Sequence, residues 1–128
     1  MKALTAEWVS KAEDDWDTGL VVFRRRKSPK YDHACFHAQQ CAEKYLKALL
    51  VEEGIAFPKT HDLRCLLNML PIRNAAWEAL RPSLANLSED AVICRYPGEV
   101  ADKAAAKESL ATARLVRALA RKHLDLPA

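Results

Sequence analysis

Glycine and β-branched residues are scarce in this chain of 128 residues, which has only three glycines. Alanine and leucine are abundant instead, and this balance favours helix over strand. No apolar run approaches the roughly 18 residues that a membrane-spanning helix needs. The first residues, Met1–Glu7, also lack the apolar stretch of a secretory leader. We therefore expect a cytoplasmic, helical protein that makes no use of a membrane.

Cysteine is present, but its spacing is not that of a disulfide framework or a zinc site. The four cysteines are Cys35, Cys41, Cys65 and Cys94. No two of them form a Cys-x-x-Cys pair, so we interpret them as reduced and mostly buried thiols. His33 and His37 have a spacing that can bind metal, with Cys41 one turn further on, but the ligand set is incomplete. We expect no metal and no cofactor.

The N-terminal part of the chain has the periodicity of an amphipathic helix. Apolar residues recur every three to four positions from Thr5, a plausible N-cap, to about Arg24. Asp15 falls at the edge of the apolar stripe, where its carboxylate can reach inward. Glu13 is expected to point away from the stripe.

The same periodicity continues to the C-terminus, interrupted by turn residues. Further helices are predicted over residues 31–53, 61–70, 74–87 and 100–124. Thr60 is expected to cap the second of these, Pro82 to kink or restart the third, and Ser88 to cap one more short turn. No repeat or linker divides the chain. We predict one domain over residues 1–128, an all-α, up-and-down four-helix bundle with one or two additional short helices.

A polar strip runs along the helix predicted at residues 31–53. Its members, spaced three and four apart, are Gln40, Glu43, Lys44 and Lys47. The rest of this helix is apolar over most of its girth, which is typical of a helix buried on more than one side. Two interpretations remain open. The strip is either a cleft that receives a nucleotide or a partner's residues, or an internal network with a link to Asp15 or Arg95.

Four stretches, in this order, carry a resemblance to a known family. They are Ala12-x-x-Asp15, Gln39-Gln40-x-x-Glu43-Lys44-x-x-Lys47, Lys59-Thr60-His61-Asp62-Leu63 and Arg95-Tyr96-Pro97. Together they resemble the HEPN domain (higher eukaryotes and prokaryotes nucleotide-binding) over nearly the whole chain. The resemblance implies a four- or five-helix bundle that usually forms a homodimer. It also implies a relation to the helical substrate-binding domain of kanamycin nucleotidyltransferase.

The resemblance further implies partners and an activity. Similar proteins are often encoded beside a minimal nucleotidyltransferase, and many act with it as a toxin–antitoxin pair in which the HEPN protein is a metal-independent RNase. That activity uses an Arg followed, after four to six residues, by a His. Arg95 stands where the Arg would be, but no His occurs from Tyr96 to Asp102. The chain therefore lacks the expected general base on a ribose 2′-OH.

Two of these motifs allow more than one interpretation. His61 belongs either to a helix start or to an anion-binding helix N-terminus. Arg95, held beside Tyr96 in a turn made rigid by Pro97, suits either a phosphate or an internal carboxylate. The candidate ligand-binding residues are Asp15, Gln40, Glu43, Lys44, Lys47, His61, Arg95 and Tyr96.

Three functions are compatible with these residues. The first is a non-catalytic module that binds a nucleotide or substrate and partners a minimal nucleotidyltransferase. The second is an RNase toxin in which Arg95 acts with another base, such as Tyr96, Glu99 or His61. The third is a protein-interaction module that uses a basic face of the last helix, where RNA is a further possible ligand. This face is formed by Lys103, Lys107, Arg114, Arg117 and Arg121, although a solvated surface is the more common role of such a stripe.

Overall fold

The protein was analysed as a computed structural model, which describes residues 1–71, 74–93 and 96–128, with the backbone alone at 91–93. Within these residues, α-helix is the only regular secondary structure, as the sequence predicted. The helices are α1 (Ala3–Arg24), α2 (Tyr31–Glu52), α3 (Leu63–Met69), α4 (Ala75–Ala79), α5 (Arg81–Ile93) and α6 (Lys103–His123). None of them is both long and apolar enough to cross a membrane.

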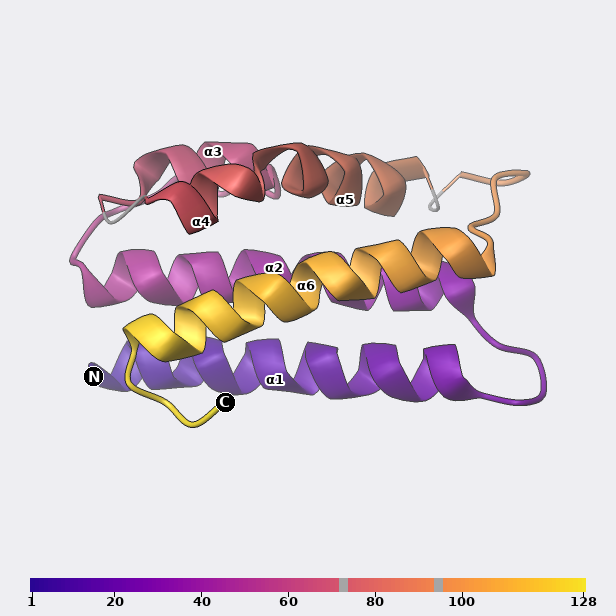
Figure 1. Cartoon of the computed structure of the whole chain (residues 1–128), viewed down its shortest axis with the longest axis horizontal. Coiled ribbons are helices and arrows are strands. Elements are labelled where there is room, and N and C mark those ends of the chain that lie inside the picture. The colour runs from indigo at the N-terminus through magenta and orange to yellow at the C-terminus, as the bar shows by residue number, and fades with distance from the viewer. Residues whose placement is uncertain (72–73, 94–95) are drawn as a thin grey trace.

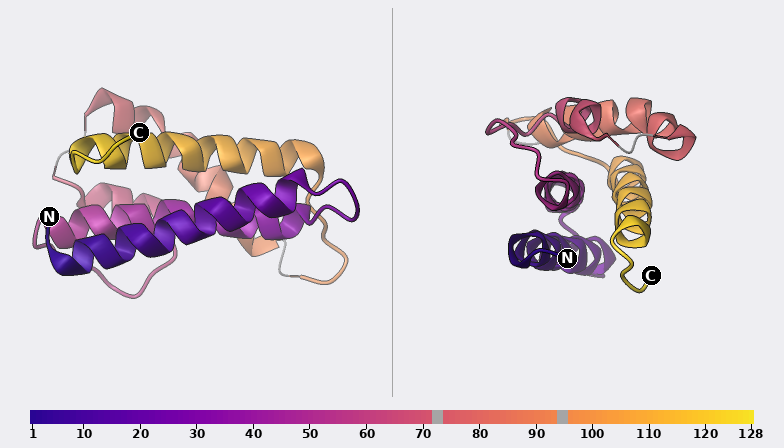
Figure 2. Two further views of the ribbon diagram at one scale, coloured as in Figure 1. Left: turned by 90° about the horizontal axis from the view of Figure 1, so that it is seen from below. Right: turned by 90° about the vertical axis from the view of Figure 1, so that its left-hand side faces the viewer.

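Helix α2 is the central element of the bundle. It packs against α1, α6, α5 and α3, and Figure 1 shows it between α1 and the layer formed by α3, α4 and α5. The end-on view in Figure 2 shows α6 along one side of α2, beside α1. Ten apolar residues of α2 are completely buried, which is the expected result for a helix that is apolar over most of its girth.

The start of α1 differs from the prediction. Thr5 is not the N-cap, because the helix begins two residues earlier, at Ala3. The side chain of Thr5 is buried and donates a hydrogen bond of 2.9 Å to Oε1 of Glu52, so it joins the start of α1 to the end of α2. Further along α1, Gly19 allows a close approach to both neighbours. A Cβ atom at this position would lie 3.3 Å from Cδ2 of Leu110 and 3.4 Å from Cβ of His37.

The start of α3 also differs. Asp62, rather than Thr60, is the N-cap, and its Oδ1 accepts hydrogen bonds from the backbone N–H groups of Arg64 (3.0 Å) and Cys65 (3.5 Å). His61 therefore precedes the helix instead of lying in its first turn. Ser88 does not cap a turn of its own. It lies within α5, where its Oγ accepts a bond of 3.4 Å from the N–H of Leu63.

The predicted restart at Pro82 is confirmed. Helix α4 ends at Ala79 and α5 begins at Arg81, so the ring of Pro82 lies in a first helical turn, where the missing N–H is tolerated. The short helix α4 places Trp77 in the core, where it is 2% exposed. Trp8 and Trp16 pack against the same core but remain partly exposed.

Candidate functional site

The first half of the polar face of α2 is organised around the carboxylate of Glu43. This residue is 3% exposed. Its Oε2 accepts a bond of 3.0 Å from Nζ of Lys47, one turn further along the helix. Its Oε1 lies 2.8 Å from Nδ1 of His61 and 3.2 Å from Nε2 of Gln39. The buried charge is thus paired and hydrogen-bonded, as burial of a carboxylate requires.

The second half is organised in the same way around Asp15, which reaches inward from α1 as predicted. Its Oδ2 lies 2.5 Å from Nζ of Lys44, and its Oδ1 lies 2.8 Å from Nδ1 of His37. Each half therefore contains one lysine, one carboxylate and one imidazole. We call these two sets the Glu43 triad (Lys47, Glu43, His61) and the Asp15 triad (Lys44, Asp15, His37).

Two glutamines connect to the triads across the helix surface. Nε2 of Gln40 donates a bond of 2.8 Å to Oε1 of Gln39, and Nε2 of Gln39 donates one of 3.0 Å to the backbone carbonyl of His61. The polar face thus extends from α1 to the segment before α3. With neutral imidazoles, its two carboxylates and two ammonium groups balance, so the face as a whole has no net charge.

The structure brings together six of the eight candidate residues. They are Asp15, Gln40, Glu43, Lys44, Lys47 and His61. Tyr96 is 62% exposed and stands apart on the segment between α5 and α6. Arg95 lies outside the described residues, so its partner is not defined.

Lys47 is further enclosed by two aromatic rings. Its Nζ lies 5.6 Å from the ring centre of Trp8 and 5.7 Å from that of Phe57. The two rings meet edge-on at 6.3 Å, which holds the loop after α2 against α1. Such cation–π contacts stabilise an ammonium group that has little water around it. Lys47 is therefore a structural cation of the fold.

The two imidazoles differ mainly in exposure. The side chain of His61 is 72% exposed, whereas that of His37 is 23% exposed. In each pair Nδ1 faces a carboxylate and must carry a proton there, so Nε2 of the neutral ring is the acceptor. His61 thus offers solvent a base whose orientation is fixed by a buried carboxylate. Gln40, half-buried, and Lys44 accompany it along the accessible edge of the face.

A third polar cluster was missed by sequence reasoning. Glu13 does not point away from the core: it accepts bonds from Nε (2.7 Å) and Nη2 (2.8 Å) of Arg117 and from the hydroxyl of Tyr45 (2.6 Å). Burial alone would raise the pKa of Glu13, but the bonds from Arg117 and Tyr45 outweigh it and the pKa is lowered. Nη1 of Arg121 lies 3.5 Å from the same carboxylate. A sequence signal existed, since Arg117 and Arg121 lie one turn apart beside the apolar stripe of α6.

This cluster corrects the predicted basic face of α6. Two of its five cations, Arg117 and Arg121, are paired with Glu13 inside the bundle. The guanidinium groups of Arg114 and Arg117 also lie over the ring of Trp16, at 5.6 and 5.8 Å from its centre. The face is therefore an intramolecular contact over much of its length.

The described residues contain a surface hollow but no grouping suited to a metal ion. Among them, no three His, Cys, Asp or Glu side chains converge in a way that could hold one. A hollow of about 610 Å³ lies between α3 and the start of α5. Its wall includes Arg81, whose guanidinium is held by Asn68 (2.8 Å) and by Glu78 (3.0 and 3.1 Å).

The fold and its polar face define an all-helical bundle in which the central helix carries two lysine–carboxylate–histidine triads. A family model described as the HEPN domain matches residues 5–123, and the chain belongs to this family. It is 30% identical over 96 residues to a protein of Methanocaldococcus jannaschii named "Putative toxin MJ1304", an alignment that covers 70% of this chain. The chain spans 61% of the length of that relative.

Two solved structures share the fold. The crystal structure of TT1696 from Thermus thermophilus superposes with a TM-score of 0.80, covering 92% of this chain and 96% of that one. The structure of ST0689, described as an archaeal HEPN homologue, superposes with a TM-score of 0.72 over 97% and 99% of the two chains. Both are 23% identical to this sequence, so they establish the architecture alone.

Proposed function

We propose that the protein is a non-catalytic, homodimeric binding module of a toxin–antitoxin-type pair, with a minimal nucleotidyltransferase as its partner in the cytoplasm. Membership of the HEPN family and the name of the archaeal relative support the pairing. The absence of a His between Tyr96 and Asp102 supports the non-catalytic assignment, because the general base expected after Arg95 is missing.

The proposal includes a nucleotide on the accessible edge of the polar face of α2. One observation carries it: both lysines of the strip are already paired with carboxylates, at 2.5 and 3.0 Å. A neutral face has little electrostatic attraction for a phosphate, but it can recognise a base or ribose by hydrogen bonds. Gln40 and Nε2 of His61 are the groups suited to that contact.

Thermal unfolding with and without ATP tests the nucleotide contact. A ligand at 100 times its Kd stabilises a folded protein by about 2.7 kcal/mol, which raises Tm by several degrees. We expect this rise in the wild type and its loss in Gln40→Ala. Unchanged Tm values at millimolar ATP would refute the nucleotide site.

The partner is tested separately, by co-expression with the nucleotidyltransferase encoded beside this gene. We expect the tagged protein to retain that enzyme through affinity purification and gel filtration, in a complex that contains two copies of this chain. A monomeric protein that elutes alone would refute both the pairing and the homodimer.

A second candidate function, a metal-independent RNase, is favoured by one specific feature. Glu43 orients the exposed imidazole of His61 at 2.8 Å, an arrangement that general bases share. Incubation of the protein with total RNA in the presence of EDTA tests it. Cleavage that is abolished by both His61→Ala and Arg95→Ala would establish this activity, whereas intact RNA would support the non-catalytic module.

A further inference from the structure

The positive charge of the protein is concentrated in one short segment. Arg24–Lys30 contains five of the 20 basic residues and no acidic residue. The remaining 15 basic and 17 acidic residues give the rest of the chain a formal charge of −2, although the whole chain has +3. The basic character of the protein is thus a property of this segment rather than of α6.

The cations of this segment differ from others in the fold because they have no internal partners. Lys44, Lys47, Arg81, Arg117 and Arg121 each face a carboxylate within 4.0 Å. In the described part of the chain, no carboxylate forms an ion pair with Arg24, Arg25, Arg26, Lys27 or Lys30. All five side chains are exposed. Their charge is therefore available to a partner outside the fold.

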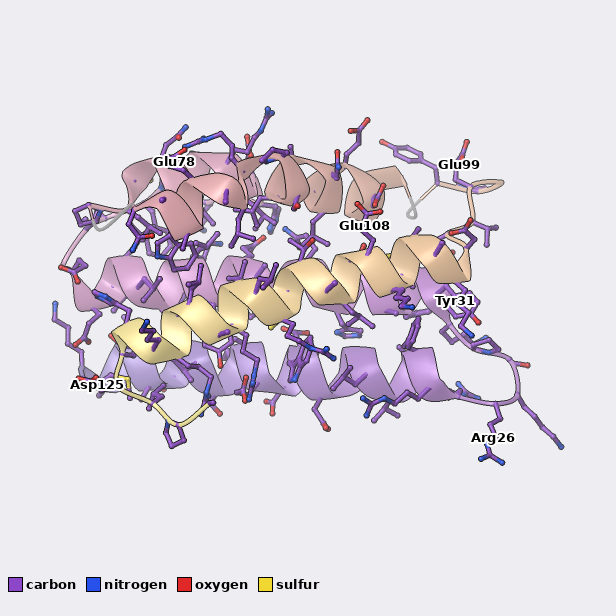
Figure 3. All side chains as sticks on the ribbon, in the orientation of Figure 1. Arg26, Tyr31, Glu78, Glu99, Glu108 and Asp125 are labelled. Carbon is purple, nitrogen blue, oxygen red and sulfur yellow. The ribbon has the colours of Figure 1, made fainter. Side chains whose placement is uncertain are left out.

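The segment has a defined shape at the end of the α1–α2 hairpin. Arg25 is extended (φ −60°, ψ 130°), and Ser28 adopts a left-handed conformation (φ 49°). The N–H of Lys30 closes the loop by donating a bond of 3.3 Å to the carbonyl of Val22. Figure 3 shows the side chain of Arg26 directed away from the bundle at this tip.

The segment between α5 and α6 lies at the same end of the bundle (Figure 1). Oδ1 of Asp32 accepts a bond of 2.6 Å from the N–H of Ala101, which ties this segment to the start of α2. Beside that bond is a hollow of about 270 Å³, lined by residues 29–33, Val100 and Ala101. Tyr96, on the same segment, exposes 62% of its surface.

We infer that this end of the bundle binds single-stranded RNA, with the cations of Arg24–Lys30 on the phosphates and Tyr96 stacked on a base. We call these six residues the basic end: Arg24, Arg25, Arg26, Lys27, Lys30 and Tyr96. Three of the five cations are arginines, whose planar guanidinium groups match phosphate oxygens in two-point contacts. An unpaired aromatic ring next to a basic track is the usual combination in proteins that bind single strands.

Other polyanions fit the basic end less well. Duplex DNA is read by a helix or ribbon inserted into a groove, and this tip is an irregular loop. An anionic membrane surface is usually bound by Trp, Phe or Leu next to the basic residues, whereas the exposed apolar residues at this end are valines. Protein interfaces are depleted of charge at their centre, unlike interfaces with nucleic acids. This inference does not rest on the proposed nucleotide site, which uses different residues.

Fluorescence anisotropy with a labelled single-stranded RNA of about 20 nucleotides tests the basic end. If four to five phosphates are neutralised, affinity should fall roughly 50- to 100-fold between 50 and 200 mM salt. A variant with all five cations of Arg24–Lys30 changed to Gln should lose most of the affinity at 50 mM salt and most of the salt dependence. Tyr96→Ala should weaken binding about fivefold or more, as expected for one lost stacking contact.

A matched variant controls for net charge. It changes five exposed cations elsewhere to Gln, namely Lys11, Lys59, Arg64, Lys107 and Lys122, and so has the same formal charge of −2 as the first variant. We expect it to bind RNA within a few-fold of the wild type, and circular dichroism should show both variants folded. Equal loss in the two variants, equal affinity for duplex DNA, or no RNA binding at 50 mM salt would overturn the inference. So would loop-dependent binding to phosphatidylserine vesicles or to the nucleotidyltransferase without loop-dependent binding to RNA.

Discussion

Nδ1 of His61 lies 2.8 Å from Oε1 of Glu43, in a pair whose imidazole is 72% exposed and whose carboxylate is 4% exposed. One side of the pair belongs to the core and the other to the surface. The buried side holds Lys47 and the loop before α3 in place. The exposed side presents an oriented nitrogen at the edge of the polar face.

Removing the charge of Glu43 should destabilise the fold. In Glu43→Gln, the ammonium of Lys47, whose side chain is 9% exposed, loses its counter-charge. Breaking a buried ion pair from one side costs about 3 kcal/mol or more. Urea unfolding should show this loss, and the double variant Glu43→Leu/Lys47→Met should recover much of it because both charges are gone. A wild-type midpoint in Glu43→Gln would contradict the assignment of the Glu43 triad to the core.

Glu13 should contribute stability that depends on pH. Its pKa in the folded protein is lowered from the ordinary value of 4.5, so the contribution is present above that value and is lost as pH falls through the folded pKa. Glu13→Gln should therefore be less stable than the wild type at pH 7 and similar to it at low pH. Unfolding free energies across this range test the prediction, and a difference that does not change with pH would contradict it.

Asp90 should behave in the opposite way. Burial, followed by the nearby charges of Glu108 and Glu89, raises its pKa above the ordinary value of 3.8. Its ionised form is therefore disfavoured in the folded state, and the penalty grows as pH rises through the folded pKa. Asp90→Asn should raise Tm at pH 7 and leave it unchanged at low pH. A lower Tm at pH 7 would show that the ionised carboxylate has a favourable role.

A larger side chain at Gly19 should separate α1 from its neighbours. The position already lies 3.3 Å from Leu110 and 3.4 Å from His37, measured from a Cβ atom alone. Gly19→Val should cost about 1–3 kcal/mol, because overpacking of this kind forces shifts in the surrounding side chains. Thr18→Val, on the exposed side of the same helix, is the matched control and should change Tm little. Equal stability of the two variants would contradict the close approach.

Periodicity was sufficient to predict the helices, because each buries an apolar stripe whose spacing is visible in the sequence. Helix starts were less certain. Thr60 and Asp62 are both good caps, and the choice between them depends on the tertiary position of the chain before α3. The inward placement of Asp15 was predictable from its position at the edge of a stripe.

The polar contacts were only partly predictable. The strip on α2 was recognised by spacing, but the pairing of Lys44 with Asp15 and of Lys47 with Glu43 depends on how α1 packs beside α2. Glu13 was missed because its partners, Tyr45 and Arg117, come from two other helices. A carboxylate at the border of an apolar stripe is compatible with both solvent and a distant cation, and the local sequence does not distinguish them.

The most direct test of the account is an NMR titration of the ¹⁵N-labelled protein with ATP. We predict shifts of the backbone amides at Gln40, Lys44 and His61, saturable with nucleotide and absent in Gln40→Ala. Signals of the basic end should move less than these. Spectra without changes at saturating ATP, or changes confined to other helices, would contradict the claim that the polar face of α2 binds a nucleotide.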